Sequence, residues 1–318
     1  MVVLFVENRI PRVLVIDRVS EKLLEGLRER GFEVTYTPGI DPVELLEKVN
    51  GYDILVVRSR HRIDSRVVEK AERLRLVVRV GTGLDNIDIE ALARRGIEVI
   101  NTPEAPVISV AELVIGLMIM CSRDLYNVVE KVKKGSWERP LGRELYGKTL
   151  CIVGLGRIGS RVAELGRALG MRVVAHDILD LSERAERLGI EFRMDLHSML
   201  PECDYISLHI PLNEGTKGMF SRREFSMLKP GCIFINTSRG GVIDPGALLE
   251  ALEAGRIWCA ALDVFEKEPP ERGSVEEALI NHPRVIPTPH IGFQTAEAQE
   301  RGAILALNKI LERFAHNA

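Results

Sequence analysis

Three short segments of the chain, each placed directly after an apolar run, carry an arginine, an acid and a histidine. Arg239 lies in NTSRGG, Glu268 in DVFEKEPP and His290 in PTPHIG. An arginine can hold a carboxylate through two parallel hydrogen bonds, a histidine exchanges protons near neutral pH, and a neighbouring acid orients its ring. Hydride transfer to or from a hydroxyl-bearing carbon needs these three groups, so we take them as candidate catalytic residues. Singly, each could also be a surface charge, a loop acid or a structural histidine.

A glycine-rich turn follows the apolar segment 149–153, TLCIV, and opens a helix-like sequence. Gly154 allows the turn, Gly156 leaves room for a pyrophosphate at the helix N-terminus, and Gly159 allows close packing of helix and strand. The next apolar run ends at Asp177, whose carboxylate can accept hydrogen bonds from ribose hydroxyls and would repel a 2′-phosphate. Alone, the glycines could mark only a tight turn, but strand, turn, helix and acid in this order predict a site for NAD.

Strand-like and helix-like segments alternate along the chain, which predicts an α/β fold with two doubly wound parallel-sheet domains. The predicted strands are 12–17, 32–37, 53–58, 74–80 and 97–101 in the first domain, and 149–153, 171–176, 204–210, 232–238, 259–264 and 284–288 in the second. We expect a substrate domain from residue 1 to 104, a dinucleotide-binding domain from 105 to 292, and a final helix that returns to the first domain in 293–318.

A single long helix is expected from Ser109 to about Lys134, apolar in its first half and charged in its second. The apolar part is too short and too interrupted to span a bilayer. It is better suited to a domain interface or a subunit interface.

The composition is that of an ordinary globular protein: 318 residues, 46% hydrophobic, with a formal net charge of −3. This balance argues against a nucleic-acid groove, and the apolar residues at the start are interrupted too soon for a signal or membrane segment. We expect a cytoplasmic protein with a small-molecule substrate. The five cysteines are far apart and form no metal-ligand pattern, so buried thiols and no metal site are expected.

The chain resembles the D-2-hydroxyacid dehydrogenase family in VGTGLDNID, SVAEL, VGLGRIG, LHIPL, INTSRGGVID, ALDVFEKEP and PHIG, in the family's order. The resemblance implies a Rossmann NAD domain inserted in a discontinuous flavodoxin-like substrate domain. It implies that Arg239 holds the substrate carboxylate, that Glu268 pairs with His290, and that His290 exchanges the proton. Asp263 would face the nicotinamide. The residues implied at the cofactor are Gly154, Gly156, Arg157, Ile158, Gly159, Asp177, His209, Pro211, Thr237, Asp263, His290 and Gly292.

Within the family, the chain is most similar to the branch that oxidises 3-phospho-D-glycerate. VVRSRHRI and VVRVGTGLDNID resemble the segments that place arginines beside the substrate phosphate, and GSWERP resembles a segment that reaches the neighbouring subunit. The substrate residues so implied are Arg58, Arg79, Gly81, Arg139, Arg239 and His290, in at least a homodimer. Arg58 and Arg79 could instead merely end buried strands.

The sequence departs from the family at Trp258 and at Phe293 and Gln294, which we expect near the active site, so another 2-keto acid stays possible. The chain stops at Ala318 without the regulatory domain of many relatives, and serine feedback through such a domain is not expected. The alternatives are a glyoxylate or hydroxypyruvate reductase, and the family's NAD-sensing corepressors. A methyltransferase would not need the Arg, Glu and His set.

Overall fold

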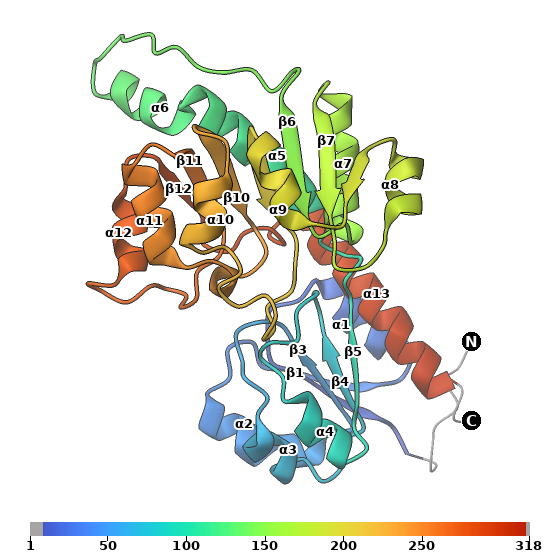
Figure 1. Cartoon of the computed structure of the whole chain (residues 1–318). Coiled ribbons are helices and arrows are strands. Elements are labelled where there is room, and N and C mark those ends of the chain that lie inside the picture. Colours follow the sequence, from blue (N-terminus) through green and yellow to red (C-terminus); the bar gives the residue numbers. More distant parts are fainter. Residues whose placement is uncertain (1–8, 316–318) are drawn as a thin grey trace. The chain divides into compact units, whose positions relative to one another are not determined.

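The computed structural model describes residues 9–315, which fall into two compact units (Figure 1). The first contains the described residues up to Pro106 and those from Phe293 onward. The second is Val107–Gly292. Residues 1–8 of the opening segment and residues 316–318 of the predicted final helical segment lie outside the described residues.

The first unit is a five-stranded parallel sheet in the order β2-β1-β3-β4-β5. Leu14, Leu55 and Val77 point to one face of the sheet, where α2, α3 and α4 cover them. Val13 and Ile54 point to the other face and pack against α1 and α13. The elements are β1 (Arg12–Val15), α1 (Glu21–Arg28), β2 (Glu33–Tyr36), α2 (Pro42–Lys48), η2 (Val49–Gly51), β3 (Ile54–Val57), α3 (Ser65–Lys70), β4 (Leu76–Arg79), α4 (Ile89–Arg94), β5 (Glu98–Asn101) and α13 (Ala296–Ala315).

The second unit is a seven-stranded parallel sheet in the order β12-β11-β10-β9-β6-β7-β8, with helices α5, α7 and α8 on one face and α9 to α12 on the other. Its elements are α5 (Val107–Arg123), α6 (Leu125–Lys133), β6 (Thr149–Val153), α7 (Arg157–Ala168), β7 (Arg172–His176), α8 (Ser182–Leu188), β8 (Glu191–Arg193), α9 (Leu196–Met199), η3 (Leu200–Glu202), β9 (Tyr205–Leu208), α10 (Arg222–Met227), β10 (Cys232–Asn236), η4 (Gly240–Val242), α11 (Pro245–Glu253), β11 (Ile257–Leu262), α12 (Val275–Asn281) and β12 (Val285–Pro287).

These orders confirm the predicted fold class. The first sheet has the flavodoxin-like order, and the second has the order of a Rossmann fold with one added strand. In each sheet the strand order reverses at one place, between β1 and β3 in the first unit and between β6 and β9 in the second. Ligands bind outside the carboxyl ends of the strands at such a reversal. The sheet topology therefore marks one candidate crevice in each unit.

The prediction of one helix from Ser109 to about Lys134 is wrong. The structure has two helices, α5 and α6, separated at Asp124, which adopts the left-handed conformation with φ 49°. The apolar side chains of α5 are buried in the second unit up to Cys121 and Ser122, whereas no residue of α6 is buried. The chain changes direction where burial ends. The three-residue edge strand β8 was also not predicted, because a segment so short shows no alternation of its own.

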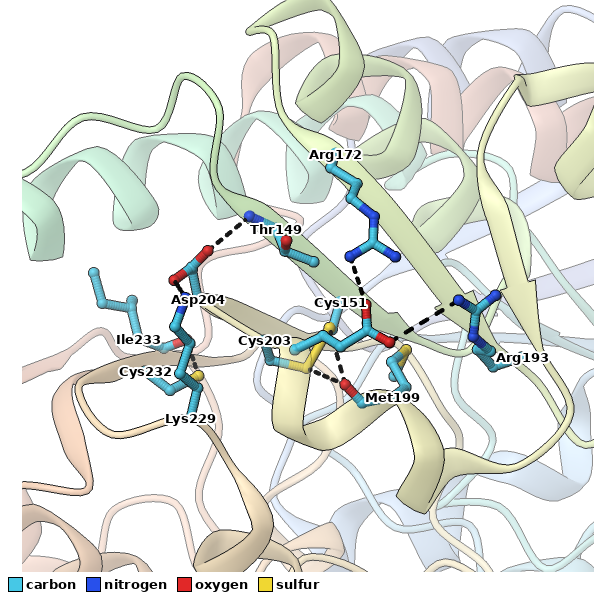
Figure 2. Close-up of a disulfide and its surroundings, with 11 residues drawn as sticks. Thr149, Cys151, Arg172, Arg193, Met199, Cys203, Asp204, Lys229, Cys232 and Ile233 are labelled. Atoms are coloured by element: carbon cyan, nitrogen blue, oxygen red, sulfur yellow. Dashed lines mark hydrogen bonds and ion pairs between the residues drawn. A yellow bond between two sulfur atoms is a disulfide. The ribbon is translucent and has the colours of Figure 1, made fainter.

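The expectation of buried thiols is wrong for four of the five cysteines. Cys121 pairs with Cys259, and Cys151 with Cys203. Figure 2 shows the second disulfide beside Asp204, whose carboxylate accepts the N–H of Thr149 at 2.9 Å. Cys151 lies on β6 and Cys203 precedes β9, the neighbouring strand, so the sheet brings together two residues 52 positions apart. Cys232 is a buried thiol, and its burial raises its pKa.

Reduction of the disulfides is expected to lower the free energy of unfolding by about 2 to 4 kcal/mol for each bond, because a cross-link restricts the unfolded chain. Denaturant unfolding of the protein with and without a dithiol reductant measures this. Cys232→Ala is the matched control, since its loss of stability should not depend on the reductant. Equal unfolding midpoints in the oxidised and reduced protein would show that the bonds do not contribute.

Candidate functional site

The turn after β6 can be made only with glycines at its two crowded positions. Gly154 has φ 96°, and a Cβ there would lie 2.5 Å from the carbonyl oxygen of His209. A Cβ on Gly159 would lie 2.0 Å from the carbonyl oxygen of Gly154. The loops after β6 and β9 therefore meet at the reversal of the sheet, and α7 packs directly on the turn.

Gly156 is open where the other two are crowded: a Cβ added there would have no heavy atom within 4 Å among the described residues. Gly156 is also the N-cap of α7 and has no side chain to cap the helix, and Arg157, Ile158 and Gly159 form the first turn, where the positive end of the helix dipole favours an anion. Nearby in the fold, after β10, the hydroxyl of Thr237 is buried without a hydrogen-bond partner in the described chain. An open anion cradle and an unsatisfied hydroxyl fit a bound dinucleotide.

Asp177 follows β7 and lies against the glycine turn. Its Oδ2 accepts the N–H of Leu155 at 2.9 Å, and its Oδ1 accepts the N–H of Leu179 at 3.1 Å. The carboxylate is thus fixed beside the turn, where it retains lone pairs for ribose hydroxyls. Sequence reasoning missed Arg184 on α8, which donates to the carbonyl oxygen of Leu155 at 2.8 Å and holds the turn from its other side.

His209 and Pro211 follow β9. The Nε2 of His209 lies 2.9 Å from the hydroxyl of Ser207, and burial lowers the pKa of His209 to about 3. This histidine is therefore neutral near pH 7 and unsuited to proton exchange. Pro211 is exposed, and its carbonyl accepts the hydroxyl of Thr216 at 2.6 Å.

His290 and Glu268 are in contact. Nδ1 of His290 lies 2.8 Å from Oε2 of Glu268, and the two side chains are 44% and 38% exposed. Partial burial acts to raise the pKa of Glu268, but the hydrogen bond and charge of His290, the N–H of Phe265 and the charge of Arg239 hold it below its usual value. Glu268 is therefore a carboxylate that leaves Nε2 of His290 free to exchange a proton. His290 itself has φ 53°, an uncommon conformation for a residue other than glycine.

Asp263 holds the segment that carries His290. Its side chain is buried, and its two oxygens accept the hydroxyl of Thr288 at 2.6 Å and the N–H groups of Ile291 and Gly292 at 2.8 and 2.9 Å. Burial raises the pKa of Asp263, with the three donors and the charge of His290 acting against that rise. The hydroxyl of Ser109 on α5 binds the carbonyl of Gly292 at 2.7 Å. These contacts on both sides of His290 explain how its backbone conformation is maintained.

Arg239 belongs to the same edge of the second sheet. Its carbonyl accepts the side-chain amide of Asn236 at 2.9 Å, and its Nη1 donates to the carbonyl of Ser238 at 2.6 Å. A Cβ on the next residue, Gly240, would lie 2.1 Å from the carbonyl carbon of Phe265. The Arg239 loop therefore packs on the loop that carries Glu268, and the second unit alone assembles all three candidate catalytic residues.

The proposed substrate arginines lie in the first unit, at the carboxyl ends of adjacent strands. Arg58 follows β3 and Arg79 ends β4. Gly81 has φ 138°, and a Cβ there would lie 1.9 Å from Nη1 of Arg79, so the guanidinium occupies the space a side chain would need. Phe293, which departs from the family pattern, lies under Arg58 with its ring centroid 5.2 Å from the guanidinium carbon.

One predicted position, that of Trp258, differs from expectation. Trp258 is the second residue of β11, five residues before Asp263, which places it about 16 Å from that strand end at the rise of a β-strand. Its ring stacks on Arg143 at 4.5 Å, so the expectation that Trp258 lies near the active site is wrong. Arg139 lies in the exposed segment between α6 and β6.

In residues 9–315 there is no group of three His, Cys, Asp or Glu side chains that could hold a metal ion. Over the same residues, no helix is both long and apolar enough to cross a membrane.

Comparison with known proteins decides the family. Residues 115–292 match the profile described as D-isomer specific 2-hydroxyacid dehydrogenase, NAD binding domain. A hydroxypyruvate reductase from Thermotoga maritima is 40% identical, over 94% of this chain and 96% of the relative. The chain belongs to this family. The match confirms the expectation of NAD as cofactor.

Two further relatives extend the likeness. A D-3-phosphoglycerate dehydrogenase from Methanocaldococcus jannaschii is 42% identical over 94% of this chain and 56% of the relative. The chain thus spans about half the length of the curated D-3-phosphoglycerate dehydrogenases that it matches. Among solved structures, a D-lactate dehydrogenase from Aquifex aeolicus complexed with NAD and lactic acid is 29% identical, with a TM-score of 0.83, covering 96% of this chain and 95% of that one.

Replacing Glu268 with glutamine is expected to move the pH profile to lower pH, because a carboxylate favours the protonated form of an adjacent imidazole. In oxidation His290 must be neutral, so the acidic limb of kcat/KM moves down. In reduction His290 must be protonated, so the basic limb moves down as well. Rate measurements over pH in both directions check this, and unchanged limbs in the variant would exclude Glu268 as the partner of the proton-exchanging group.

Proposed function

We propose that the protein oxidises a D-2-hydroxy acid to the 2-keto acid with NAD. The observation that carries the proposal is the contact of His290 with Glu268, with Arg239 packed beside them, at the same sheet edge as the open glycine turn. The second unit would bind NAD, and the first unit would contribute to substrate binding. The family and the relatives described above support this reading.

Each catalytic side chain has one task in this reaction. Nε2 of His290 accepts the proton of the substrate hydroxyl, and Glu268 stabilises the charge that the imidazole then carries. Arg239 binds the substrate carboxylate through its fork of N–H donors and sets the orientation of the reacting carbon. Bound NAD supplies the acceptor for the hydride. Asp263 keeps His290 in place through its contacts with Thr288, Ile291 and Gly292.

The substrate that we propose is 3-phospho-D-glycerate, oxidised to 3-phosphohydroxypyruvate in serine biosynthesis. A phosphate and a carboxylate on one small molecule require several cations, and the first unit presents Arg58 and Arg79 at neighbouring strand ends. The D-3-phosphoglycerate dehydrogenase relatives support this substrate. The full-length likeness to a hydroxypyruvate reductase favours a second candidate, reduction of hydroxypyruvate or glyoxylate.

Purified protein with NAD and a panel of 2-hydroxy acids, each offered as D and L isomers, tests the proposed reaction. We expect NADH formation with D isomers and none above background with L isomers. The matched control is His290→Ala, which should form no NADH above background with either isomer. NADH formation from L isomers alone, or a wild-type protein that binds NAD and oxidises nothing in the panel, would contradict the proposal and favour a binding role.

Replacing Asp177 with alanine is expected to relax cofactor choice. The change removes both the hydrogen bonds to the ribose hydroxyls and the repulsion of a 2′-phosphate, so kcat/KM for NAD should fall and that for NADP should rise, each by about tenfold. Steady-state kinetics with both cofactors measure the ratio. If the unmutated protein already used NADP as well as NAD, Asp177 would not be the discriminating residue.

We also propose that the protein acts in the cytoplasm as a homodimer or larger homo-oligomer. The α6 helix and the following segment expose Tyr126, Val129, Trp137 and Leu141, which suits contact with a second copy. Arg139 lies in this segment and would reach the neighbouring active site. A fully active monomer by light scattering would exclude the oligomer.

A further inference from the structure

A buried acid sits at the strand-order reversal of the first unit, directly beside Arg58. Asp17 follows β1, is 4% exposed, and accepts the backbone N–H of Arg58 on Oδ2 at 2.5 Å. Its other oxygen, Oδ1, lies 3.0 Å from Nδ1 of His61, which is itself 6% exposed. The reversal between β1 and β3 is where a ligand of this unit would bind, so both buried groups lie next to the proposed phosphate site.

The two ring nitrogens of His61 both face oxygen atoms. Nε2 lies 2.9 Å from the carbonyl oxygen of Ile40, which can only accept, so Nε2 carries a proton. Nδ1 faces the carboxylate of Asp17, which also accepts the N–H of Arg58 and lies close enough to the Arg58 guanidinium for their charges to interact. A carboxylate can only accept hydrogen bonds, so Nδ1 carries a proton too. Asp17 and His61 are then a carboxylate and an imidazolium with no net charge.

The pair is tied to the whole segment from Arg58 to His61. The side-chain amide of Asn86 donates to the carbonyl oxygens of Arg58 and His61 at 2.9 and 2.6 Å. Nη1 of Arg58 lies 3.3 Å from the carbonyl of Arg18, the residue after Asp17. Burial lowers the pKa of Arg58, and the charge of Asp17 acts against that. The position of the Arg58 side chain therefore depends on the backbone that Asp17, His61 and Asn86 hold.

We propose that Asp17 and His61 are positioning residues for phosphate recognition by Arg58. Asp17 fixes the backbone at Arg58, but an uncompensated carboxylate there would repel a doubly charged phosphate. His61 cancels that charge while holding the other end of the loop. This inference rests on the proposed substrate and extends it to two residues that make no contact with the substrate.

The test compares 3-phospho-D-glycerate with D-glycerate, which differ only by the phosphate. His61→Gln leaves Asp17 charged, and we expect KM for 3-phospho-D-glycerate to rise about tenfold or more, while kcat and the KM for D-glycerate stay within about twofold. Asp17→Asn combined with His61→Gln removes the uncompensated charge and should recover most of the loss. The matched control is His197→Gln, which breaks another histidine–carboxylate pair, with Glu224, on α9 and α10 of the second unit.

A purely structural role predicts different results. With a structural role, His61→Gln would raise KM for both substrates alike, or the double variant would have the same KM for 3-phospho-D-glycerate as the single variant. Either result overturns the proposal. In an Arg58→Ala background, His61→Gln should raise KM for 3-phospho-D-glycerate by less than it does alone, because the part of its effect that acts through Arg58 is lost and only the repulsion by Asp17 remains. A full additional rise in that background would also overturn it.

The outcome with Arg58→Ala separates this inference from the proposed function. If Arg58→Ala leaves KM for 3-phospho-D-glycerate unchanged, the phosphate role of Arg58 fails and this inference fails with it. If Arg58→Ala raises that KM but His61→Gln does not, the phosphate role of Arg58 stands and only the positioning role of Asp17 and His61 fails. Nitrogen-15 NMR of the unmutated protein gives a readout without turnover: both ring nitrogens of His61 should be protonated, and a neutral ring would overturn the charge argument.

Discussion

Replacing His290 with alanine is expected to lower kcat by about 100- to 10,000-fold, the range typical for loss of a general acid or base. His290 is the histidine of the second unit that is exposed, bonded to a carboxylate and placed at the carboxyl end of a strand. NAD binding should change little, because the proposed task of the imidazole concerns the substrate proton. Turnover rates together with a fluorescence titration of NADH measure both quantities.

The matched control for this variant is His197→Ala, which removes a histidine bonded to a different carboxylate, Glu224. It should leave kcat near the wild-type value. Near-normal kcat with an ordinary pH profile in His290→Ala would mean that another group exchanges the proton. A large loss of NADH affinity would instead assign His290 mainly to the cofactor.

Replacing Arg58 or Arg79 with alanine is expected to reduce kcat/KM for 3-phospho-D-glycerate by about tenfold to a hundredfold. A charge-assisted hydrogen bond contributes roughly 1.5 to 3 kcal/mol, which corresponds to that range. Activity on glyoxylate or hydroxypyruvate should hardly change, since neither carries a phosphate. Arg239→Ala should impair every substrate, because all of them share the carboxylate that Arg239 would bind.

Gly81→Ala is a companion variant that leaves both arginines in the sequence. Its methyl group would occupy the space of Nη1 of Arg79, 1.9 Å away, so the variant should reproduce the selectivity of Arg79→Ala. Equal losses on phosphorylated and unphosphorylated substrates in the Arg58 and Arg79 variants would show that these arginines are structural. Hydride transfer would then still rest on Arg239, Glu268 and His290.

Much of the fold could be predicted because its signals are local. Each buried parallel strand is a short apolar run, and the glycine turn combines its residues within six positions, so both sheets and the edge that carries the candidate site follow from neighbouring residues. Features that depend on distant contacts could not be predicted. The disulfide between Cys121 and Cys259 joins residues 138 positions apart, and Asp124 interrupts a helical pattern where burial of α5 ends.

The site residues also divide into those that the sequence indicates and those that only distant contacts bring together. His290 and Glu268 could be paired through the family resemblance, but nothing local indicates that Asp17 and His61 meet, because they approach only where the order of the first sheet reverses. The available signal was positional: Asp17 is the first charged residue after the apolar run of β1, as Asp177 and Asp263 are after the runs of β7 and β11. Trp258 was misplaced because its strand, β11, runs from the far edge of the sheet toward Asp263.

We propose that this family member oxidises a D-2-hydroxy acid that it recognises by its phosphate. The most direct test is the ratio of kcat/KM for 3-phospho-D-glycerate to that for D-glycerate, measured as NADH formation by the unmutated protein. Two arginine contacts at about 1.5 kcal/mol each predict a ratio of at least about 100. A ratio near one would contradict phosphate recognition by Arg58 and Arg79.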